Sequence, residues 1–160
     1  MVPIRKMISQ DRIFILDMLA ETKMFKPAEI DVAMELVDIF LTNEKQKDYN
    51  IYVAEDKDQK AIGYVCYGPT PATEGTFDLY WIVVSPENQH QGIGKNLLNF
   101  TENQVLKQNG RQIIIETSSQ PKYKPTRQFY LNNNYLIEAR IKDFYRSGDD
   151  RLIFVKRLIS

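Results

Sequence analysis

The stretch VVSPENQHQGIGKNLLNF, residues 83–100, decides how this sequence is interpreted. A strand-like apolar run leads into it and a helix-like run ends it, and between them residues 89–95, QHQGIGK, set two glycines one residue apart. Glycines let backbone amides approach a ligand without a Cβ in the way, and a helix N-terminus carries partial positive charge. The stretch therefore predicts either a diphosphate cradle, with one further charge from Lys95, or a tight turn that binds nothing.

Two familiar phosphate-binding motifs do not fit this stretch. The dinucleotide fingerprint requires a third glycine for close packing of helix on strand, and Leu97 stands in that place. A P-loop requires a glycine five residues before Gly94 and a Ser or Thr after the lysine, but Gln89 and Asn96 occupy those positions. The spacing excludes both nucleotide motifs.

The composition is that of an ordinary globular protein. The chain has 160 residues, of which 43% are hydrophobic and 26% charged, and 21 basic residues balance 21 acidic ones. No run of like charges indicates nucleic-acid binding, and no apolar run suits a signal peptide or a membrane span. With one cysteine and one histidine, a metal site is not expected. We predict a single domain, residues 1–160, in the cytoplasm.

Hydrophobic periodicity predicts an α+β fold, a mixed sheet with helices on its faces. Ser9 is expected to cap a first helix whose apolar stripe is Ile13, Leu16 and Leu19 or their neighbours. The predicted strands are 2–8, 51–55, 61–68, 76–84, 112–117, 135–143 and 151–158. The predicted helices are 9–19, 27–42, 92–109 and 126–133, with Asn109-Gly110 as a left-handed stop and Thr126 as a cap.

Cys66 lies inside one predicted strand. A cysteine becomes a nucleophile when a helix N-terminus or a cation lowers its pKa, and the sequence shows neither nearby. We interpret Cys66 as a small buried hydrophobic residue.

Val83-Val84-Ser85-Pro86, followed by QHQGIG, resembles the acetyl-coenzyme A signature of the GNAT family of N-acetyltransferases. In that family Q/R-x-x-G-x-G/A follows an apolar strand that ends in a V-x-P-like sequence. The strand IIIET and the pair Phe129-Tyr130 follow in the family's order and approximate spacing. The family often has the sequence F-Y-x-x-x-G-F where this chain has Phe129 to Tyr135. Here Asn134 replaces the glycine, and asparagine is also suited to the left-handed conformation that ends a helix.

The resemblance implies a central, mixed but mostly antiparallel sheet of about seven strands with about four helices on its faces, and acetyl-coenzyme A (acetyl-CoA) as co-substrate, with no metal. The backbone around residues 82–84 would form hydrogen bonds with the amides of the pantetheine. A backbone N–H there would also donate to the oxyanion that forms on the thioester carbonyl. His90 is expected to be a solvated residue of the diphosphate loop and not a base. The cofactor-binding residues implied are Ile82, Val83, Val84, Gln89, His90, Gln91, Gly92, Ile93, Gly94 and Lys95.

Acetyl transfer to an amine requires a base, because an alkylammonium with a pKa of about 10 is mostly charged at neutral pH. Asp78, on the strand before the signature, is the first candidate. Glu116 at the end of IIIET is the second, and Glu74 is the third. A site without a dedicated protein base remains an alternative. Strand alternation predicts that Asp78, Tyr80 and Ile82 share one face.

The departing thiolate requires a proton. The thiol of coenzyme A has a pKa of about 8.5, so a tyrosine with a pKa of about 10 can supply that proton. Tyr130 matches the family's usual donor position, although it is also suited to packing its helix on the sheet. Tyr123 and Tyr145 are the reserve candidates.

We therefore predict direct transfer of an acetyl group from acetyl-CoA to a primary amine. A catalytically silent acyl-CoA sensor or interaction module and a purely structural domain are the alternatives. The acceptor is a small-molecule or peptide/protein amine: a protein N-terminus or lysine, a free amino acid, a polyamine or an antibiotic. No nucleic-acid or membrane partner is expected, and the resemblance allows a homodimer. Carboxylates that could rim an acceptor cleft are Glu74, Asp78, Asp143, Asp149 and Asp150.

Overall fold

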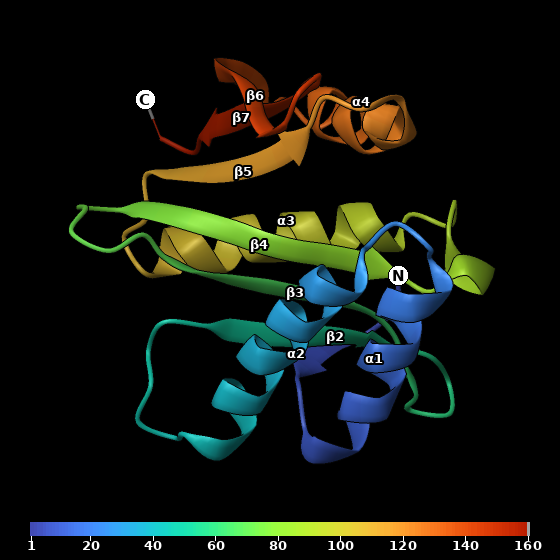
Figure 1. The fold of residues 1–160 in the computed structure, drawn as a ribbon. Coiled ribbons are helices and arrows are strands. Elements are labelled where there is room, and N and C mark those ends of the chain that lie inside the picture. The colour runs from blue at the N-terminus through green and yellow to red at the C-terminus, as the bar shows by residue number, and fades with distance from the viewer. Residues whose placement is uncertain (160) are drawn as a thin grey trace.

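A computed structural model describes residues 1–159 as one seven-stranded sheet with helices on both faces (Figure 1). The strands are β1 Ile4–Lys6, β2 Asn50–Glu55, β3 Ala61–Pro69, β4 Thr76–Val84, β5 Gln112–Ser118, β6 Leu136–Arg146 and β7 Asp149–Arg157. The helices are α1 Arg12–Glu21, α2 Pro27–Thr42, α3 Ile93–Lys107 and α4 Lys124–Asn132. Short 3-10 turns precede three of them: η1 Ser9–Asp11, η2 Pro86–Asn88 and η3 Pro121–Tyr123. The predicted α+β architecture is confirmed.

The strand order is β1-β2-β3-β4-β5-β7-β6, and β4 with β5 is the parallel pair in an otherwise antiparallel sheet. This parallel pair is short: residues 76–78 of β4 lie opposite residues 112–114 of β5. Beyond that point the two strands diverge toward α4 (Figure 1). The divergence opens the middle of the sheet.

A bulge interrupts β4 at Tyr80. The register with β3 shifts there, so that Tyr80 has no residue opposite it. Tyr80 and Trp81 consequently both pack against the core under α1 and α2, whereas Ile82 packs against the core under α3. The predicted common face of Asp78, Tyr80 and Ile82 is therefore wrong, because one inserted residue reverses the alternation beyond it.

Two apolar cores lie on opposite faces of the sheet. α3 buries its predicted face on one side: Ile93, Leu97, Leu98 and Val105. α1 buries Leu19 as predicted, but Ile13 is 54% exposed, and the neighbouring residues Ile15 and Met18 are buried instead. The sequence of α1 is apolar almost all round, so periodicity alone does not choose its buried side. Cys66 is buried as predicted, and burial raises the pKa of its thiol.

The helix starts differ from those predicted. Ser9 begins the η1 turn, and Asp11 directly precedes α1. α4 begins at Lys124, ahead of the predicted cap Thr126, because Pro125 fits a first helical turn. β1 is shorter than predicted, and β6 extends three residues further than predicted because it forms a hairpin with β7.

The helix ends agree with prediction. Asn109 after α3 has a φ of 61°, and Asn134 after α4 has a φ of 69°, both in the left-handed region. Asn134 thus serves where the family often has glycine. None of the described helices has the length and apolar character that crossing a membrane requires.

Candidate active site

Two adjoining cavities occupy the opening in the sheet. The first, which we call the loop groove, has a volume of about 520 Å³ and lies between residues 88–95 and α4. The second, the strand cleft, has a volume of about 770 Å³ and lies between β4 and β5, bounded by the α1–α2 loop and the β6–β7 hairpin. The two cavities meet at residues that line both: Ile82, Val84, Gln89, Thr126 and Tyr130.

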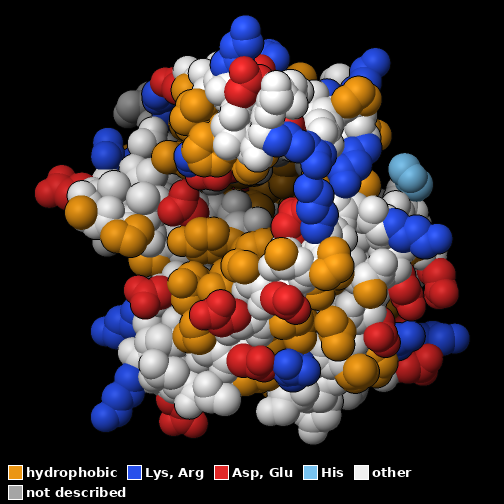
Figure 2. Space-filling model, viewed as in Figure 1, with side chains coloured by type: hydrophobic (Ala, Val, Ile, Leu, Met, Phe, Trp, Pro, Cys, Tyr) orange, Lys and Arg blue, Asp and Glu red, His pale blue; other side chains and the backbone are white. Residues whose placement is uncertain are grey.

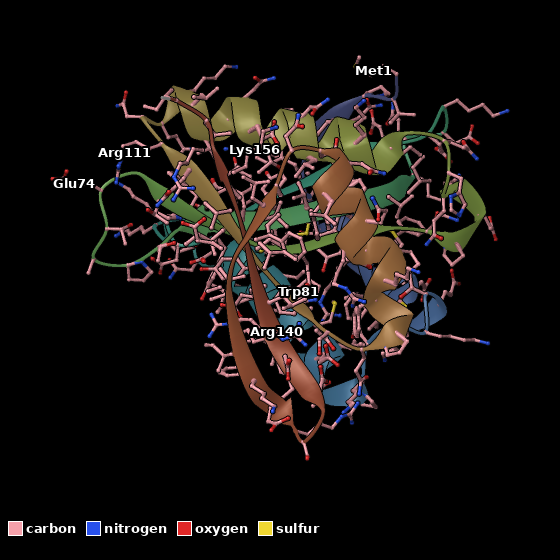
Figure 3. All side chains as sticks on the ribbon, turned by 90° about the horizontal axis from the view of Figure 1, so that it is seen from above. Met1, Glu74, Trp81, Arg111, Arg140 and Lys156 are labelled. Carbon is pink, nitrogen blue, oxygen red and sulfur yellow. The ribbon has the colours of Figure 1, made fainter. Side chains whose placement is uncertain are left out.

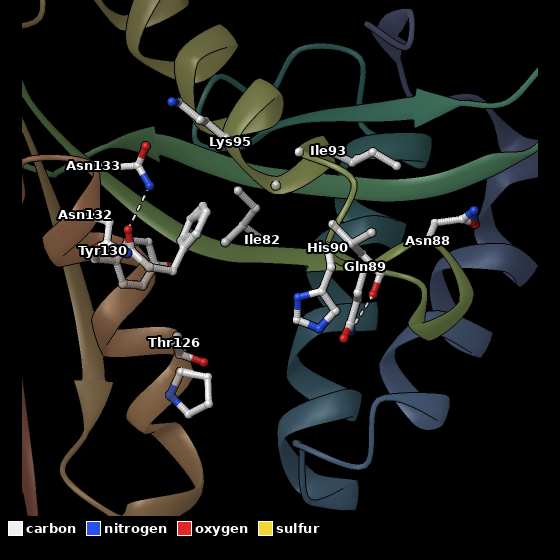
Figure 4. Close-up of a pocket in the computed structure, with 15 residues that line it drawn as sticks. Ile82, Asn88, Gln89, His90, Ile93, Lys95, Thr126, Tyr130, Asn132 and Asn133 are labelled. Carbon is white, nitrogen blue, oxygen red and sulfur yellow. Dashed lines mark hydrogen bonds between the residues drawn. The ribbon is translucent and has the colours of Figure 1, made fainter.

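The loop groove is built on the first turn of α3. Gly92 has a φ of 81°, and a Cβ there would meet no atom within 4 Å. The first bond of the helix runs from the Asn96 N–H to the Gly92 carbonyl at 3.0 Å. The amides of Ile93, Gly94 and Lys95 therefore have no partner within the helix, as at any helix N-terminus. Figure 4 shows the loop residues facing Thr126 and Tyr130 of α4. This turn is suited to binding a phosphate group.

Gly94 lies next to Phe129 of α4. A Cβ at Gly94 would lie 3.5 Å from the ring of Phe129, so the aromatic side chain packs directly beneath the glycine loop. Phe129 in turn lies edge-on to Tyr130, with ring centroids 5.3 Å apart. The glycine signature and the Phe129-Tyr130 pair, 35 residues apart in sequence, thus form one site.

Eight of the ten residues expected to bind acetyl-CoA line the loop groove: Ile82, Val84, Gln89, His90, Gly92, Ile93, Gly94 and Lys95. Val83 instead is buried and lines the strand cleft. Gln91 lies apart, with its Nε2 3.5 Å from the Glu87 carbonyl. Phe129, which the F-Y motif marked, lines the groove as well. Sequence reasoning did not assign the cofactor to these further lining residues: Asn88, Pro125, Thr126, Asn132 and Asn133.

Asp78 lies where β4 and β5 begin to diverge. Its carboxylate lines the strand cleft and accepts a hydrogen bond from the Thr70 hydroxyl at 2.8 Å. Thr70 is neutral, so this contact leaves the negative charge of the carboxylate uncompensated. Burial first, and then the charge of Asp78, raise the pKa of the neighbouring Tyr80 to about 12. Tyr80 is therefore a neutral phenol beside Asp78 at physiological pH.

The other two candidate bases lie in different surroundings. Glu116 lines the strand cleft but forms an ion pair with Arg151. Glu74 is exposed on the β3–β4 loop, where its carbonyl accepts a hydrogen bond from Arg111 Nε at 2.8 Å. Figure 3 shows Glu74 and Arg111 together at the edge of the molecule, away from Trp81. Glu74 lines neither cavity in the described chain.

Tyr130 lies where the loop groove and the strand cleft meet. It is only 4% exposed and packs against Tyr135 and Phe154, with ring centroids 5.8 and 5.9 Å away. Burial raises the pKa of its phenol, which keeps it protonated at physiological pH. Tyr130 packs α4 onto the sheet, as one interpretation predicted, and it also lines both cavities; its role as proton donor stays a prediction.

The two reserve tyrosines also line the strand cleft. Tyr123 donates its hydroxyl to the Met24 carbonyl at 3.0 Å, which ties η3 to the α1–α2 loop. Burial raises the pKa of Tyr123 and of Tyr145.

The five carboxylates expected to rim a cleft separate into two groups. Asp78 and Asp149 line the strand cleft. Asp143 and Asp150 instead stabilise the β6–β7 hairpin: Asp143 accepts the Gly148 N–H, and Asp150 accepts the Asp143 N–H and pairs with Arg140. The fifth, Glu74, stands apart. Sequence reasoning missed Glu29 of α2, which reaches the cleft from the opposite end of the sequence.

Residues 47–147 match the sequence family described as the acetyltransferase (GNAT) domain. The chain belongs to the GNAT family. A crystal structure of a candidate GNAT acetyltransferase from Desulfovibrio desulfuricans is 42% identical to this GNAT chain, and superposes over 99% of it and 100% of the other with a TM-score of 0.95. This GNAT chain is accordingly an N-acetyltransferase.

More distant GNAT structures share the fold. An aminoglycoside 6′-N-acetyltransferase complexed with coenzyme A is 15% identical, with 99% and 98% of the two chains covered and a TM-score of 0.76. The ribosomal-protein-S18-alanine N-acetyltransferase from Escherichia coli is 13% identical, with 100% and 96% covered and a TM-score of 0.78. No curated protein sequence matches this chain. Identities this low support the fold and leave the acceptor open.

Proposed function

We propose that this chain, as one domain of residues 1–160, transfers the acetyl group of acetyl-CoA directly to a primary amine. The observation that carries this proposal is the meeting of two cavities at Tyr130, one with free backbone amides and the other with an unpaired carboxylate. Two adjoining cavities allow both substrates to be bound together, as direct transfer requires. The one cysteine, Cys66, is buried in the core and so is not suited to carry the acetyl group.

The loop groove fits the diphosphate and pantetheine of acetyl-CoA. Amides of the first turn of α3 would hold the diphosphate, with Lys95 adding positive charge. The pantetheine would follow β4 past Val84 and Ile82 toward Tyr130. Since β4 has no β5 partner beyond Asp78, its backbone is available to pair with amides of the cofactor and to meet the oxyanion.

Asp78 is proposed as the base. It takes a proton from the acceptor ammonium, directly or through a water, and the neutral nitrogen then attacks the thioester carbonyl. Glu116 is less suited, because accepting a proton would break its ion pair with Arg151. The combination of a cleft position and a neutral partner, Thr70, favours Asp78.

Tyr130 is proposed as the acid. When the new C–N bond has formed and the C–S bond breaks, its phenol donates a proton to the departing sulfur. Because burial raises its pKa above that of the thiol, a long-lived phenolate is unfavourable. Proton donation should therefore accompany C–S cleavage. The phenolate regains a proton from the nitrogen, directly or through a water, because the attacking nitrogen must lose its second proton to become the amide.

The glycine loop gives a direct test of cofactor binding. Gly92 and Gly148 both have a φ of 81°, and a Cβ at either would meet nothing within 4 Å. Alanine at either position should therefore cause similar backbone strain. Gly92→Ala should weaken acetyl-CoA binding about tenfold by calorimetry, because the Cβ enters the cradle, whereas Gly148→Ala should bind as the wild type does. Equal affinity in all three proteins would remove the cradle from the proposal.

The homodimer is proposed to form through β6, which is one of the two edge strands of the sheet and is longer than the other, β1. All eleven residues of β6 are exposed, including Ile141 and Phe144 at 42% and 48%. An antiparallel edge can pair with the same edge of a second copy. Light scattering should give twice the monomer mass for the wild type and the monomer mass for Ile141→Asp. A monomeric wild type at micromolar concentration would contradict this.

A cytoplasmic location stays a prediction.

A further inference from the structure

Among residues 1–159, one carboxylate of the strand cleft has neither a cationic nor a backbone partner. The carboxylates that line it are Glu29, Asp78, Glu116 and Asp149. Glu116 is paired with Arg151, and Asp78 has only the neutral Thr70 hydroxyl. A positively charged group of the acceptor is therefore drawn to Asp78, at the start of the opening between β4 and β5.

The remaining two carboxylates have other contacts. Glu29 accepts the backbone N–H of Lys26 at 3.1 Å, which stabilises the start of α2 but, like the Thr70 contact of Asp78, does not compensate its charge. Asp149 is only 5% exposed, accepts the Ser118 hydroxyl, and lies 3.8 Å from the Nε of Arg146, so its charge is compensated. Glu29 belongs to the same helix start as Lys26, whereas Asp78 is the uncompensated carboxylate at the opening between β4 and β5.

Three cations converge on the same cleft from separate parts of the chain. Lys26 comes from the α1–α2 loop, Lys122 from η3 and Arg146 from the end of β6. Within residues 1–159, no carboxylate lies within 4.0 Å of the ammonium of Lys26 or Lys122. Figure 2 shows Lys and Arg side chains gathered beside the central hollow, next to hydrophobic surface. Arg146 is paired with Asp149, so Lys26 and Lys122 are the cations of this cluster that favour a bound anionic group.

The contacts of Lys122 leave its charge uncompensated. Its Nζ lies 3.3 Å from the Met24 carbonyl and 5.1 Å from the ring centroid of Tyr123. Both contacts hold the ammonium at the mouth of the cleft, and neither neutralises it. Aromatic side chains also line the strand cleft, among them Phe25, Tyr80 and Trp81.

We infer that the acceptor is a small amine of the amino-acid class, which carries an anionic group in addition to its ammonium. This inference rests on the proposed function, because it assigns the strand cleft to the acceptor. The ammonium lies toward Asp78 and the anionic group toward Lys26 and Lys122, and the apolar or aromatic side chain of the amino acid packs against the aromatic residues of the cleft. A polycation such as a polyamine or an aminoglycoside is disfavoured by the same two lysines.

The test compares amines that differ only in the anionic group. Calorimetry of the protein saturated with coenzyme A should show that phenylalanine binds about tenfold more tightly than phenethylamine, and more tightly than spermidine. Equal affinity, tighter binding of phenethylamine or spermidine, or no binding of any of them overturns the inference. Release of thiol from acetyl-CoA by the same amines tests the proposed function separately, because binding does not depend on turnover.

Charge reversal locates the anion site. Lys122→Glu should remove the preference for phenylalanine over phenethylamine, while leaving the affinity for phenethylamine within about twofold of the wild-type value. Lys124→Glu, which makes the same charge change on an exposed residue outside both cavities, should keep the preference. If Lys122→Glu also keeps the preference, or Lys124→Glu also loses it, the assignment to this cluster is wrong.

Discussion

Replacing Tyr130 with Phe is expected to lower the rate of acetyl transfer about a hundredfold or more, with little change in the affinity for acetyl-CoA. The substitution removes one hydroxyl and keeps the ring that packs against Tyr135 and Phe154. The fold should therefore persist while the departing sulfur loses its proton donor. Steady-state rates and calorimetry of the same preparations measure the two effects.

Tyr64→Phe is the matched control, because it also removes one buried phenol hydroxyl but lies away from both cavities. Its hydroxyl has no hydrogen-bond partner in the described chain, so its loss should be nearly neutral. The pH profile adds a check. A raised pKa keeps Tyr130 protonated as pH rises, so the wild-type rate should not fall between pH 7 and about 10. An unchanged rate in Tyr130→Phe would assign the acid role to another group.

Asp78→Asn is expected to lower kcat/KM about a hundredfold at neutral pH, since it removes the base and keeps the shape of the side chain. The loss should shrink as pH rises toward about 10, because a growing share of the acceptor amine is then neutral without help from the protein. Rates across this range, with one amine at fixed concentration, give the profile.

Glu116→Gln provides the comparison for Asp78→Asn, because both carboxylates line the strand cleft. Glu116 already pairs with Arg151, so its replacement should cost less activity than that of Asp78. A larger loss in Glu116→Gln, or a loss in Asp78→Asn that does not shrink at high pH, would move the base role away from Asp78.

Much of the fold could be predicted because local signals agree with the tertiary structure. Helix α3 has a clear apolar face and a left-handed stop at Asn109, and the glycine signature lies at its start. α1 shows the limit of such signals. Its apolar residues surround the helix, so contacts with α2 and the sheet, rather than periodicity, selected Ile15 and Met18 for burial.

The site was less predictable, because it depends on contacts between distant segments and on one irregularity. The bulge at Tyr80 changes the face of the sheet on which Ile82 lies. No residue pattern in β4 predicts this bulge. The ion pair of Glu116 with Arg151 forms only when β5 and β7 become neighbours in the sheet. Asp78 likewise contacts Thr70 because the turn between β3 and β4 brings the two residues together. Thr70 is neutral, so the charge of Asp78 is not compensated.

The most direct test of direct transfer follows free thiol and intact protein mass together. The protein is mixed with acetyl-CoA alone, and then with acetyl-CoA and each of a set of primary amines that includes phenylalanine. The proposed mechanism predicts thiol release only when an accepted amine is present, with one acetylated amine formed for each thiol and no change in protein mass. Thiol release with an acetylated protein in the absence of amine, or no thiol release with any amine, would contradict it.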